Sequence, residues 1–263
     1  MALIQMDFFS KSLSRLASVN VLLPNDSDEE QKADNAAYER NMKTLYLLHG
    51  YTGNRNDWLL NSRVSEISSR YNLAVVCPSG ENSFYTDAPG AGRAFGQYIG
   101  RELVDYCRQT FGLSLNRADT FIGGLSMGGF GALRNALQYN QTFGKVFALS
   151  SALIIHNIKG MREGDADQIA DYAYYRSVFG DLAALEESPA NPEYWVRKMA
   201  PGCCPAIYMA CGRDDFLIEE NRAFKSFLDT QKIPVRYTED DGEHDWDYWN
   251  RHLEPAVRWL LDE

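Results

Sequence analysis

The order of apolar and polar residues predicts a regular alternation of strands and helices along the chain. Short, continuously apolar runs are typical of strands in a parallel sheet whose two faces are both covered. Strands are predicted over residues 18–24, 43–49, 73–78, 119–125, 145–150, 206–211 and 234–239; the inner ones are such runs, whereas 18–24 alternates between apolar and polar residues. Apolar residues spaced three or four positions apart predict helices over residues 59–70, 98–110, 127–139, 219–230 and 246–262.

This alternation predicts a single α/β domain over residues 1–263, built on a mainly parallel, doubly wound sheet with right-handed crossovers. Functional residues in such a sheet gather at the carboxyl ends of the strands. The polar and acidic interval 25–40 is interpreted as a solvated loop between two neighbouring strands.

One long segment departs from this alternation. Residues 151–205 separate two predicted strands and are rich in aromatic side chains. Asn191 followed by Pro192 is typical of a helix start, because asparagine caps the first turn and proline fits its first position. We expect a short helical cap insertion over about 153–200 that covers the catalytic edge of the sheet. Ordinary helices packed on the sheet are the alternative.

Composition narrows the classes of partner. The 263-residue chain has a net charge of −10, which argues against nucleic acid or an anionic membrane surface as a partner. No apolar run is long enough to span a bilayer. Asp7 and Lys11 interrupt the first apolar residues, so no secretory signal is predicted. The five cysteines show no disulfide framework, and we expect a cytoplasmic location.

A nucleophile-elbow pattern surrounds Ser126. The frame Gly124-Leu125-Ser126-Met127-Gly128 joins a predicted buried strand to a predicted helix. Glycines two positions before and after the serine leave room for a sharp backbone turn. The amino end of the following helix favours negative charge beside the serine, where an oxyanion would form. A bystander serine in a glycine-rich turn is the alternative interpretation.

A serine nucleophile needs a histidine base, which in turn needs an acid to orient it. Of the four histidines, His244 lies in the loop between the last predicted strand and the last helix. Asp214 and Asp215 both follow the preceding strand, and the order Ser126, Asp215, His244 is the order expected for this kind of sheet. We interpret His49, in the strand-end tripeptide His49-Gly50-Tyr51, as a structural residue that holds its loop by hydrogen bonds.

Two backbone amides should stabilise the oxyanion. Met127 directly follows the proposed nucleophile, and Tyr51 follows the strand that ends in His49-Gly50, with Gly53 as the second choice. Acidic residues and histidines crowd the segment 240–252, which raises the hypothesis of a metal site. However, one segment rarely supplies a closed set of ligands, and no paired cysteines or H-E-x-x-H motif accompany it. We therefore expect no metal and no other cofactor.

Several short motifs extend over nearly the whole chain: LLHGYTGNRNDW, NSFYTD, YIGREL, GLSMGGFGAL, VFGDL, CGRDDFL and GEHDWDYW. Together they resemble the esterase D family of α/β-hydrolases, tributyrin esterase type, which includes bacterial acetyl and feruloyl esterases. The resemblance implies an α/β-hydrolase fold, a triad of Ser126, Asp215 and His244, an oxyanion amide at Tyr51, no metal or organic cofactor, and possible homodimers. The sequence departs from the family's usual pattern at Glu243, beside His244, and in its long acidic loop.

The expected function is that of a serine carboxylesterase acting on small-molecule esters, with short-chain acyl or hydroxycinnamoyl (feruloyl) groups. The alternatives are a thioesterase similar to S-formylglutathione hydrolase and a non-catalytic binding protein on a hydrolase scaffold. Four aromatic residues are candidates for substrate contact, although each could equally belong to the core: Trp58, Phe84, Tyr85 and Trp195.

Overall fold

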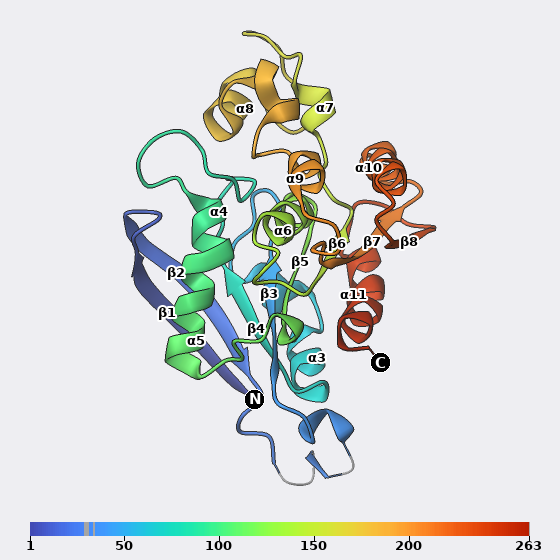
Figure 1. Cartoon of the computed structure of the whole chain (residues 1–263). Helices are drawn as coiled ribbons and strands as arrows, with labels where there is room; N and C mark the ends of the chain where they lie inside the picture. Colours follow the sequence, from blue (N-terminus) through green and yellow to red (C-terminus); the bar gives the residue numbers. More distant parts are fainter. Residues whose placement is uncertain (29–31, 34, 263) are drawn as a thin grey trace.

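A twisted β-sheet runs through the centre of the molecule (Figure 1). The computed structural model describes residues 1–28, 32–33 and 35–262, and within these residues the sheet has eight strands in the order β1-β2-β4-β3-β5-β6-β7-β8. All neighbours from β4 to β8 are parallel, which confirms the predicted mainly parallel sheet. The strands are β1 (Ala2–Ser10), β2 (Arg15–Leu23), β3 (Lys43–Leu48), β4 (Leu73–Pro78), β5 (Thr120–Leu125), β6 (Lys145–Leu149), β7 (Ala206–Gly212) and β8 (Val235–Asp240).

The first strand, β1, was not predicted. It pairs antiparallel with β2 along its whole length, from Ala2 opposite Leu23 to Ser10 opposite Arg15. β2 in turn pairs antiparallel with β4. The prediction that the acidic loop joins neighbouring strands was therefore wrong, since β4 lies between β2 and β3 in the sheet. Residues 29–31 and 34 of that loop lie outside the described residues.

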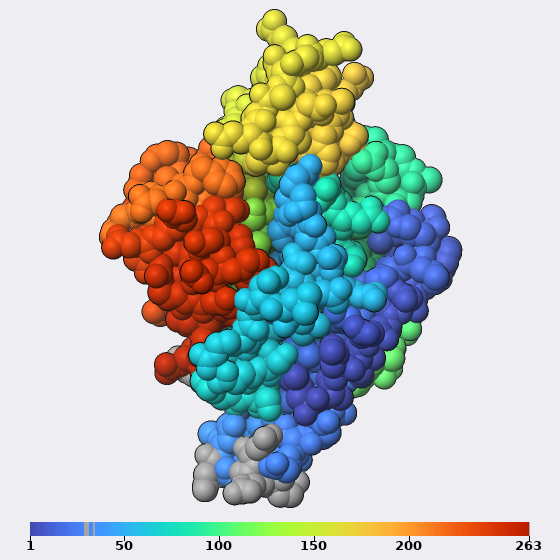
Figure 2. All heavy atoms as spheres, turned by 180° about the vertical axis from the view of Figure 1, so that it is seen from behind, coloured from blue at the N-terminus to red at the C-terminus, as the bar shows by residue number. Residues whose placement is uncertain are grey.

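Helices cover both faces of the sheet (Figure 1). On one face α5 (Leu103–Phe111), α6 (Met127–Gln138) and α10 (Ile218–Thr230) contribute to the larger apolar core. On the other face α3 (Val64–Arg70) and α11 (Trp246–Leu261) lie side by side over a second core (Figure 2). No helix among the described residues is long and apolar enough to cross a membrane.

Two of the predicted helices are divided. The predicted helix 59–70 is interrupted at Ser62, so that α2 (Asp57–Asn61) precedes α3. The predicted helix 98–110 starts earlier, as α4 (Phe95–Gln97), passes through the π-helical turn η2 (Tyr98–Glu102) and continues as α5. The three predicted helices nearer the carboxyl terminus form as α6, α10 and α11, each starting within one residue of the expected position.

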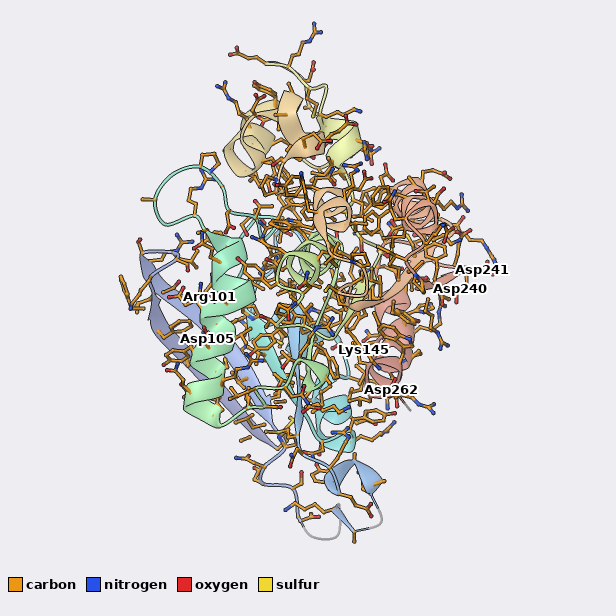
Figure 3. The ribbon with its side chains drawn as sticks, in the orientation of Figure 1. Arg101, Asp105, Lys145, Asp240, Asp241 and Asp262 are labelled. Carbon is orange, nitrogen blue, oxygen red and sulfur yellow. The ribbon has the colours of Figure 1, made fainter. Side chains whose placement is uncertain are left out.

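α11 is tied to the sheet at two points (Figure 3). The Lys145 ammonium, at the start of β6, lies 2.5 Å from the carboxylate of Asp262 at the end of the helix. Near its first turns, the His252 imidazole Nε2 lies 3.1 Å from the carboxylate of Asp240, the last residue of β8. These contacts fix the helix that follows the loop carrying His244.

The segment between β6 and β7 carries several short helices, and we use the name cap for its residues 153–200. Its upper part stands above the carboxyl ends of the strands (Figures 1 and 2), whereas its last helix, α9, packs against α6 in the body. Asn191 accepts a hydrogen bond from the Glu193 amide and Pro192 is the first helical residue, which confirms the predicted helix start. The elements of the cap are α7 (Ile155–Ile158), α8 (Tyr172–Phe179), η4 (Leu182–Glu187) and α9 (Pro192–Lys198).

Candidate active site

Ser126 occupies a strained turn between β5 and α6. Its backbone has φ 53° and ψ −120°, a conformation that non-glycine residues rarely adopt. The two flanking glycines are required by close backbone contacts. A Cβ on Gly124 would lie 2.4 Å from the Gly128 carbonyl oxygen, and one on Gly128 would lie 2.4 Å from the Leu48 carbonyl oxygen. The turn therefore holds the Ser126 side chain at the carboxyl edge of the sheet.

The structure brings Ser126, His244 and Asp215 into one hydrogen-bonded series. His244 Nε2 lies 3.0 Å from the Ser126 hydroxyl oxygen, and His244 Nδ1 lies 2.9 Å from Asp215 Oδ2. Because an ionised carboxylate can only accept, Nδ1 carries the proton and donates it to Asp215. Nε2 then carries a lone pair that accepts the Ser126 O–H, which is the arrangement needed for general-base activation of a serine.

The ends of β7 and β8 set the distance between the acid and the base. The Arg213 amide donates to the Asp240 carbonyl oxygen at 2.9 Å, and the Asp214 amide donates to the Gly242 carbonyl oxygen at 3.1 Å. Gly212 lies so close to the same loop that a Cβ on it would be 2.1 Å from the Gly242 oxygen. This backbone contact places Asp215 beside the histidine loop and leaves Asp214 exposed to solvent.

The Asp215 carboxylate is buried but remains a strong acid. Burial alone would raise its pKa, but hydrogen bonds from His244, from the Ser150 hydroxyl and from the Leu217 amide outweigh burial and hold the pKa below its ordinary value. The Leu217 amide donates to Asp215 Oδ1 at 2.9 Å. Asp215 is therefore ionised at neutral pH and can stabilise a positively charged His244.

Tyr51 and Met127 both line the pocket into which Ser126 opens. Met127 is the first residue of α6, where helix amides lack intrahelical partners. Within the described part of the chain, neither the Tyr51 nor the Met127 amide donates a hydrogen bond. The Gly53 amide, in contrast, donates to the Gly50 carbonyl oxygen at 3.2 Å, which makes it the poorer candidate for an oxyanion donor.

His49 is a structural residue, as predicted. Its Nδ1 lies 2.7 Å from the Gly50 carbonyl oxygen, and its Nε2 accepts a hydrogen bond from the Gly80 amide at 2.8 Å. The amide can only donate, so Nε2 is unprotonated and the proton sits on Nδ1. Burial lowers the pKa of His49 below its ordinary value, although the Gly50 carbonyl and Asp57 oppose this shift. A neutral ring thus holds the loop that carries Tyr51.

The pocket at Ser126 has a volume of about 380 Å³, and its lining combines apolar and aromatic side chains with polar ones such as Asp57 and Gln168. The cap contributes only Gln168 and Ile169, which precede α8. The His244 ring lies 4.6 Å from the Phe216 ring and 5.1 Å from the Trp249 ring, measured between centroids. Several lining residues were not predicted from the sequence. Phe216, Trp246 and Trp249 lie close in sequence to Asp215 or His244 and could have been found by that proximity, whereas Gln168 and Ile169 lie far from both.

Comparison with known proteins decides the family. Residues 10–260 match the family described as "Putative esterase". The chain belongs to this esterase family. It is 48% identical over 262 residues to an acetyl esterase of Caldicellulosiruptor saccharolyticus, with 99% of this chain and 98% of the relative covered.

Two solved structures extend this result. A fluorophosphonate-binding serine hydrolase of Staphylococcus aureus superposes with a TM-score of 0.84 at 26% identity, covering 100% of this chain and 99% of the other. An S-formylglutathione hydrolase of the same species gives a TM-score of 0.81 at 27% identity, covering 99% and 98%. These findings confirm the α/β-hydrolase fold and the resemblance to esterase D, and the protein is a carboxylic ester hydrolase.

Of the four aromatic candidates for substrate contact, only Phe84 lines the pocket of this esterase. The other three do not line this pocket, and each makes a structural contact instead. Trp58 is 1% exposed and donates from Nε1 to the Leu48 carbonyl oxygen at 2.9 Å. The Tyr85 hydroxyl donates to the His49 carbonyl oxygen at 3.0 Å, and Trp195 Nε1 donates to the Pro189 carbonyl oxygen at 2.8 Å.

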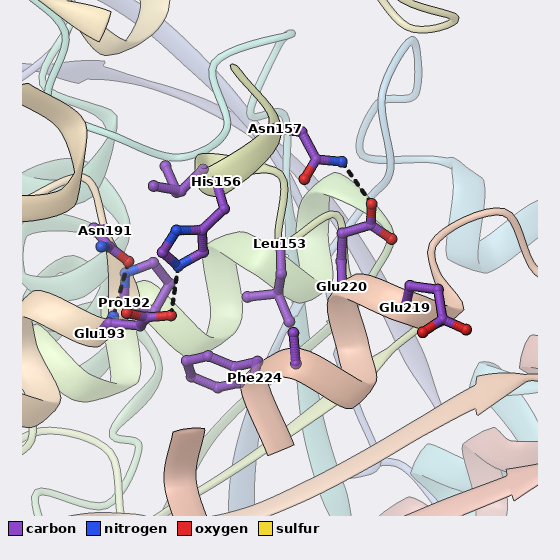
Figure 4. A pocket seen from close by; sticks show the side chains of 11 residues that line it. Leu153, His156, Asn157, Asn191, Pro192, Glu193, Glu219, Glu220 and Phe224 are labelled. Atoms are coloured by element: carbon purple, nitrogen blue, oxygen red, sulfur yellow. Dashed lines mark hydrogen bonds and ion pairs between the residues drawn. The ribbon is translucent and has the colours of Figure 1, made fainter. Parts of the chain in front are cut away.

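The esterase has another cavity, of about 350 Å³, between the cap and α10 (Figure 4). Its floor includes Leu153 and Phe224, and His156 Nε2 lies 2.8 Å from the Glu193 carboxylate at its edge. None of the residues that line it carries a hydroxyl or thiol group. This cavity therefore offers no serine, threonine, tyrosine or cysteine side chain, whereas the pocket of about 380 Å³ contains Ser126.

Proposed function

We propose that the esterase hydrolyses short-chain acyl esters, acetyl esters first among them, with Ser126 as nucleophile, His244 as base and Asp215 as the orienting acid. The observation that carries this proposal is the hydrogen-bonded series from Ser126 through His244 to Asp215, at a pocket of about 380 Å³. The 48% identical acetyl esterase supports the choice of acyl group. We treat residues 1–263 as one catalytic domain.

The proposed reaction has two steps. His244 Nε2 accepts the Ser126 proton while Ser126 attacks the ester carbonyl, and the Tyr51 and Met127 amides donate to the developing oxyanion. His244 then protonates the departing alcohol. Water, activated by the same nitrogen, attacks the acyl-enzyme and releases the acid. Asp215 stays ionised throughout and stabilises the imidazolium.

Hydroxycinnamoyl esters are the second class of substrate that we consider for this pocket. The aromatic rings of Phe84, Phe216 and Trp246 line the pocket and offer faces and edges for a planar acyl group. A thioester is the alternative substrate, with a thiol as its leaving group, since the 27% identical structure is an S-formylglutathione hydrolase. The same triad can release an alcohol or a thiol, so the rates measured on esters and on a thioester distinguish the two substrates.

The test is a matched panel of initial rates for the wild-type enzyme and Ser126→Ala. The substrates are aryl acetate, aryl butyrate, aryl octanoate, methyl ferulate and S-formylglutathione. We expect the highest kcat/KM on acetate and butyrate, with a loss of at least about 10³-fold in Ser126→Ala on each active substrate. A preference for ferulate or for S-formylglutathione would replace the proposed substrate class. Wild-type rates in Ser126→Ala would overturn the proposed mechanism.

A further inference from the structure

Ser150, directly after β6, lies in an unusual backbone conformation behind the acid of the triad. Its φ is +47°, a value that glycine adopts freely and serine does not. The side chain is completely buried, and its amide donates to the Ala210 carbonyl oxygen on β7 at 2.8 Å. Strained backbone positions of this kind cluster at functional sites. A serine at a position better suited to glycine indicates that the hydroxyl group itself is needed.

The Ser150 hydroxyl has three polar partners: the Trp249 indole, the Asp215 carboxylate and the Cys211 thiol. Trp249 Nε1 lies 3.1 Å from the Ser150 oxygen, in a fully buried contact. An indole nitrogen can only donate, so the Ser150 oxygen accepts from Trp249 and its own proton is free to be donated. The Ser150 hydroxyl also hydrogen-bonds to the Asp215 carboxylate, which can only accept. Burial raises the pKa of the Cys211 thiol and keeps it neutral, and an ionised carboxylate is a stronger acceptor than a neutral thiol. The series therefore runs from Trp249 through Ser150 to Asp215.

Trp249 also contacts the base directly. Its ring meets the His244 ring edge to face, with centroids 5.1 Å apart and an interplanar angle of 89°. One indole thus packs on the imidazole of the base and, through Ser150, holds the carboxylate of the acid. Trp249 lies in the first turn of α11, which is anchored to β8 through His252 and Asp240. The position of both groups is therefore coupled to a rigid helix.

We propose that Ser150 and Trp249 are positioning residues, which hold Asp215 and His244 in the mutual orientation that proton transfer from Ser126 requires. This inference rests on the proposed function of the triad and adds two residues to it. With Ser150 donating to Asp215, the carboxylate has fewer free positions in which to rotate away from His244 Nδ1. The Trp249 indole packs against the His244 imidazole, so that ring is held by packing as well as by its hydrogen bond to Asp215.

The experiment compares Ser150→Gly and Trp249→Phe with the wild-type enzyme. Glycine suits the positive φ at position 150 and removes the small hydroxymethyl side chain, while phenylalanine keeps a smaller aromatic ring beside His244 and removes the N–H donor. Ser151→Ala is the matched control: Ser151 is equally buried, adjacent in sequence, and its hydroxyl has no hydrogen-bond partner among the described residues. Ser126→Ala is measured alongside, on aryl acetate.

We expect kcat to fall about tenfold to a hundredfold in Ser150→Gly, because a hydrogen bond to a charged group is lost, with KM changed less than about twofold. Trp249→Phe should lose less, and the double variant should lose little more than Ser150→Gly, since the two residues act in series. Ser151→Ala should keep the wild-type kcat. Circular dichroism and thermal unfolding check that each variant is folded.

Wild-type kcat in folded Ser150→Gly and Trp249→Phe, with Ser126→Ala inactive, would overturn this inference and leave the proposed triad intact. An equal loss in Ser151→Ala would also overturn it, since the effect would then come from repacking alone. Wild-type activity in Ser126→Ala would instead overturn the proposed function on which the inference rests. The two failures are therefore distinguishable in one set of measurements.

Discussion

The carboxyl ends of the central strands and the cap contribute to the same pocket by different physical means. At the strand ends, backbone atoms approach so closely that glycine is required at positions 124, 128 and 212. The cap reaches the pocket only through Gln168 and Ile169, on a loop before α8. The cap glycine Gly160, in contrast, has no atom near the position of an added Cβ.

This difference separates two tasks. Bond-making chemistry requires atoms held within a few tenths of an ångström, and the strand ends provide this through backbone contacts that leave no room for adjustment. Selection of a substrate needs only a wall of suitable shape, and a loop on an inserted segment can change that wall without disturbing the chemistry. We therefore expect changes at the strand ends to affect kcat or folding, and changes in the cap to affect KM and specificity.

The largest effect is expected at the acid. Asp215→Asn should lower kcat by about 10³- to 10⁴-fold, because an amide can donate to His244 Nδ1 and so favours the wrong imidazole tautomer. Asp214→Asn is the matched control, since Asp214 is exposed and adjacent, and its kcat should stay near that of the wild-type enzyme. Initial rates on aryl acetate decide. Equal losses in both variants would remove the distinction between the two aspartates.

A methyl group at the elbow should destabilise the fold. Gly128→Ala places a Cβ 2.4 Å from the Leu48 carbonyl oxygen, so we expect the free energy of unfolding to fall by about 1–3 kcal/mol, with loss of activity. The cap variant Gly160→Ala should change it by less than about 0.5 kcal/mol, because an added Cβ meets nothing there. Urea denaturation measures both. Comparable effects at the two glycines would contradict the contrast between strand ends and cap.

A smaller effect is expected in the cap wall. Ile169→Ala removes apolar surface that lines the pocket, so KM for aryl butyrate should rise about threefold to tenfold while kcat stays within about twofold. Trp195→Phe removes an indole that bonds Pro189 outside the pocket, and its KM should not change. Full Michaelis curves on acetate and butyrate distinguish the two variants. A large loss of kcat in Ile169→Ala would show that the cap takes part in the chemistry.

The smallest effect concerns pH and stability. Burial lowers the pKa of folded His49 below 6.5, so the unfolded chain binds its proton first as pH falls. The contribution of neutral His49 is fully present above pH 6.5 and is lost as pH falls from 6.5 through the lowered folded pKa. In His49→Gln the free energy of unfolding should decline less steeply across that window. Part of the decline should remain, because the pKa of His252 is also lowered, chiefly by burial.

The sequence predicted most of the fold because its main signals are local. Buried parallel strands are continuously apolar, and each follows or precedes a helix with a clear apolar face. β1 was not predicted because it is an edge strand in which exposed and partly buried residues alternate, and Asp7 within it faces solvent. The break between α2 and α3 depends on Ser62, whose hydroxyl bonds back to the Trp58 carbonyl oxygen, a contact that the sequence pattern does not reveal.

The candidate site also has a part that could be predicted from local sequence and a part that could not. The elbow, the acid and the base each lie in a short motif at a strand end, so their meeting could be predicted from chain order and topology. The aromatic wall could not, because the burial of a ring depends on residues distant in sequence. Trp58 and Trp246 illustrate this: their ring centroids lie 5.2 Å apart, yet only Trp246 lines the pocket.

The central claim is that Ser126 is the nucleophile of this esterase, and covalent labelling tests it most directly. The wild-type enzyme would be treated with a fluorophosphonate, digested and mapped by mass spectrometry, alongside Ser126→Ala and Asp214→Asn. We predict a single adduct on the Ser126 oxygen in the wild-type enzyme and in Asp214→Asn, with activity lost in proportion to labelling, and no adduct in Ser126→Ala. An adduct on another residue, or full hydrolytic activity in enzyme labelled completely at Ser126, would contradict the account.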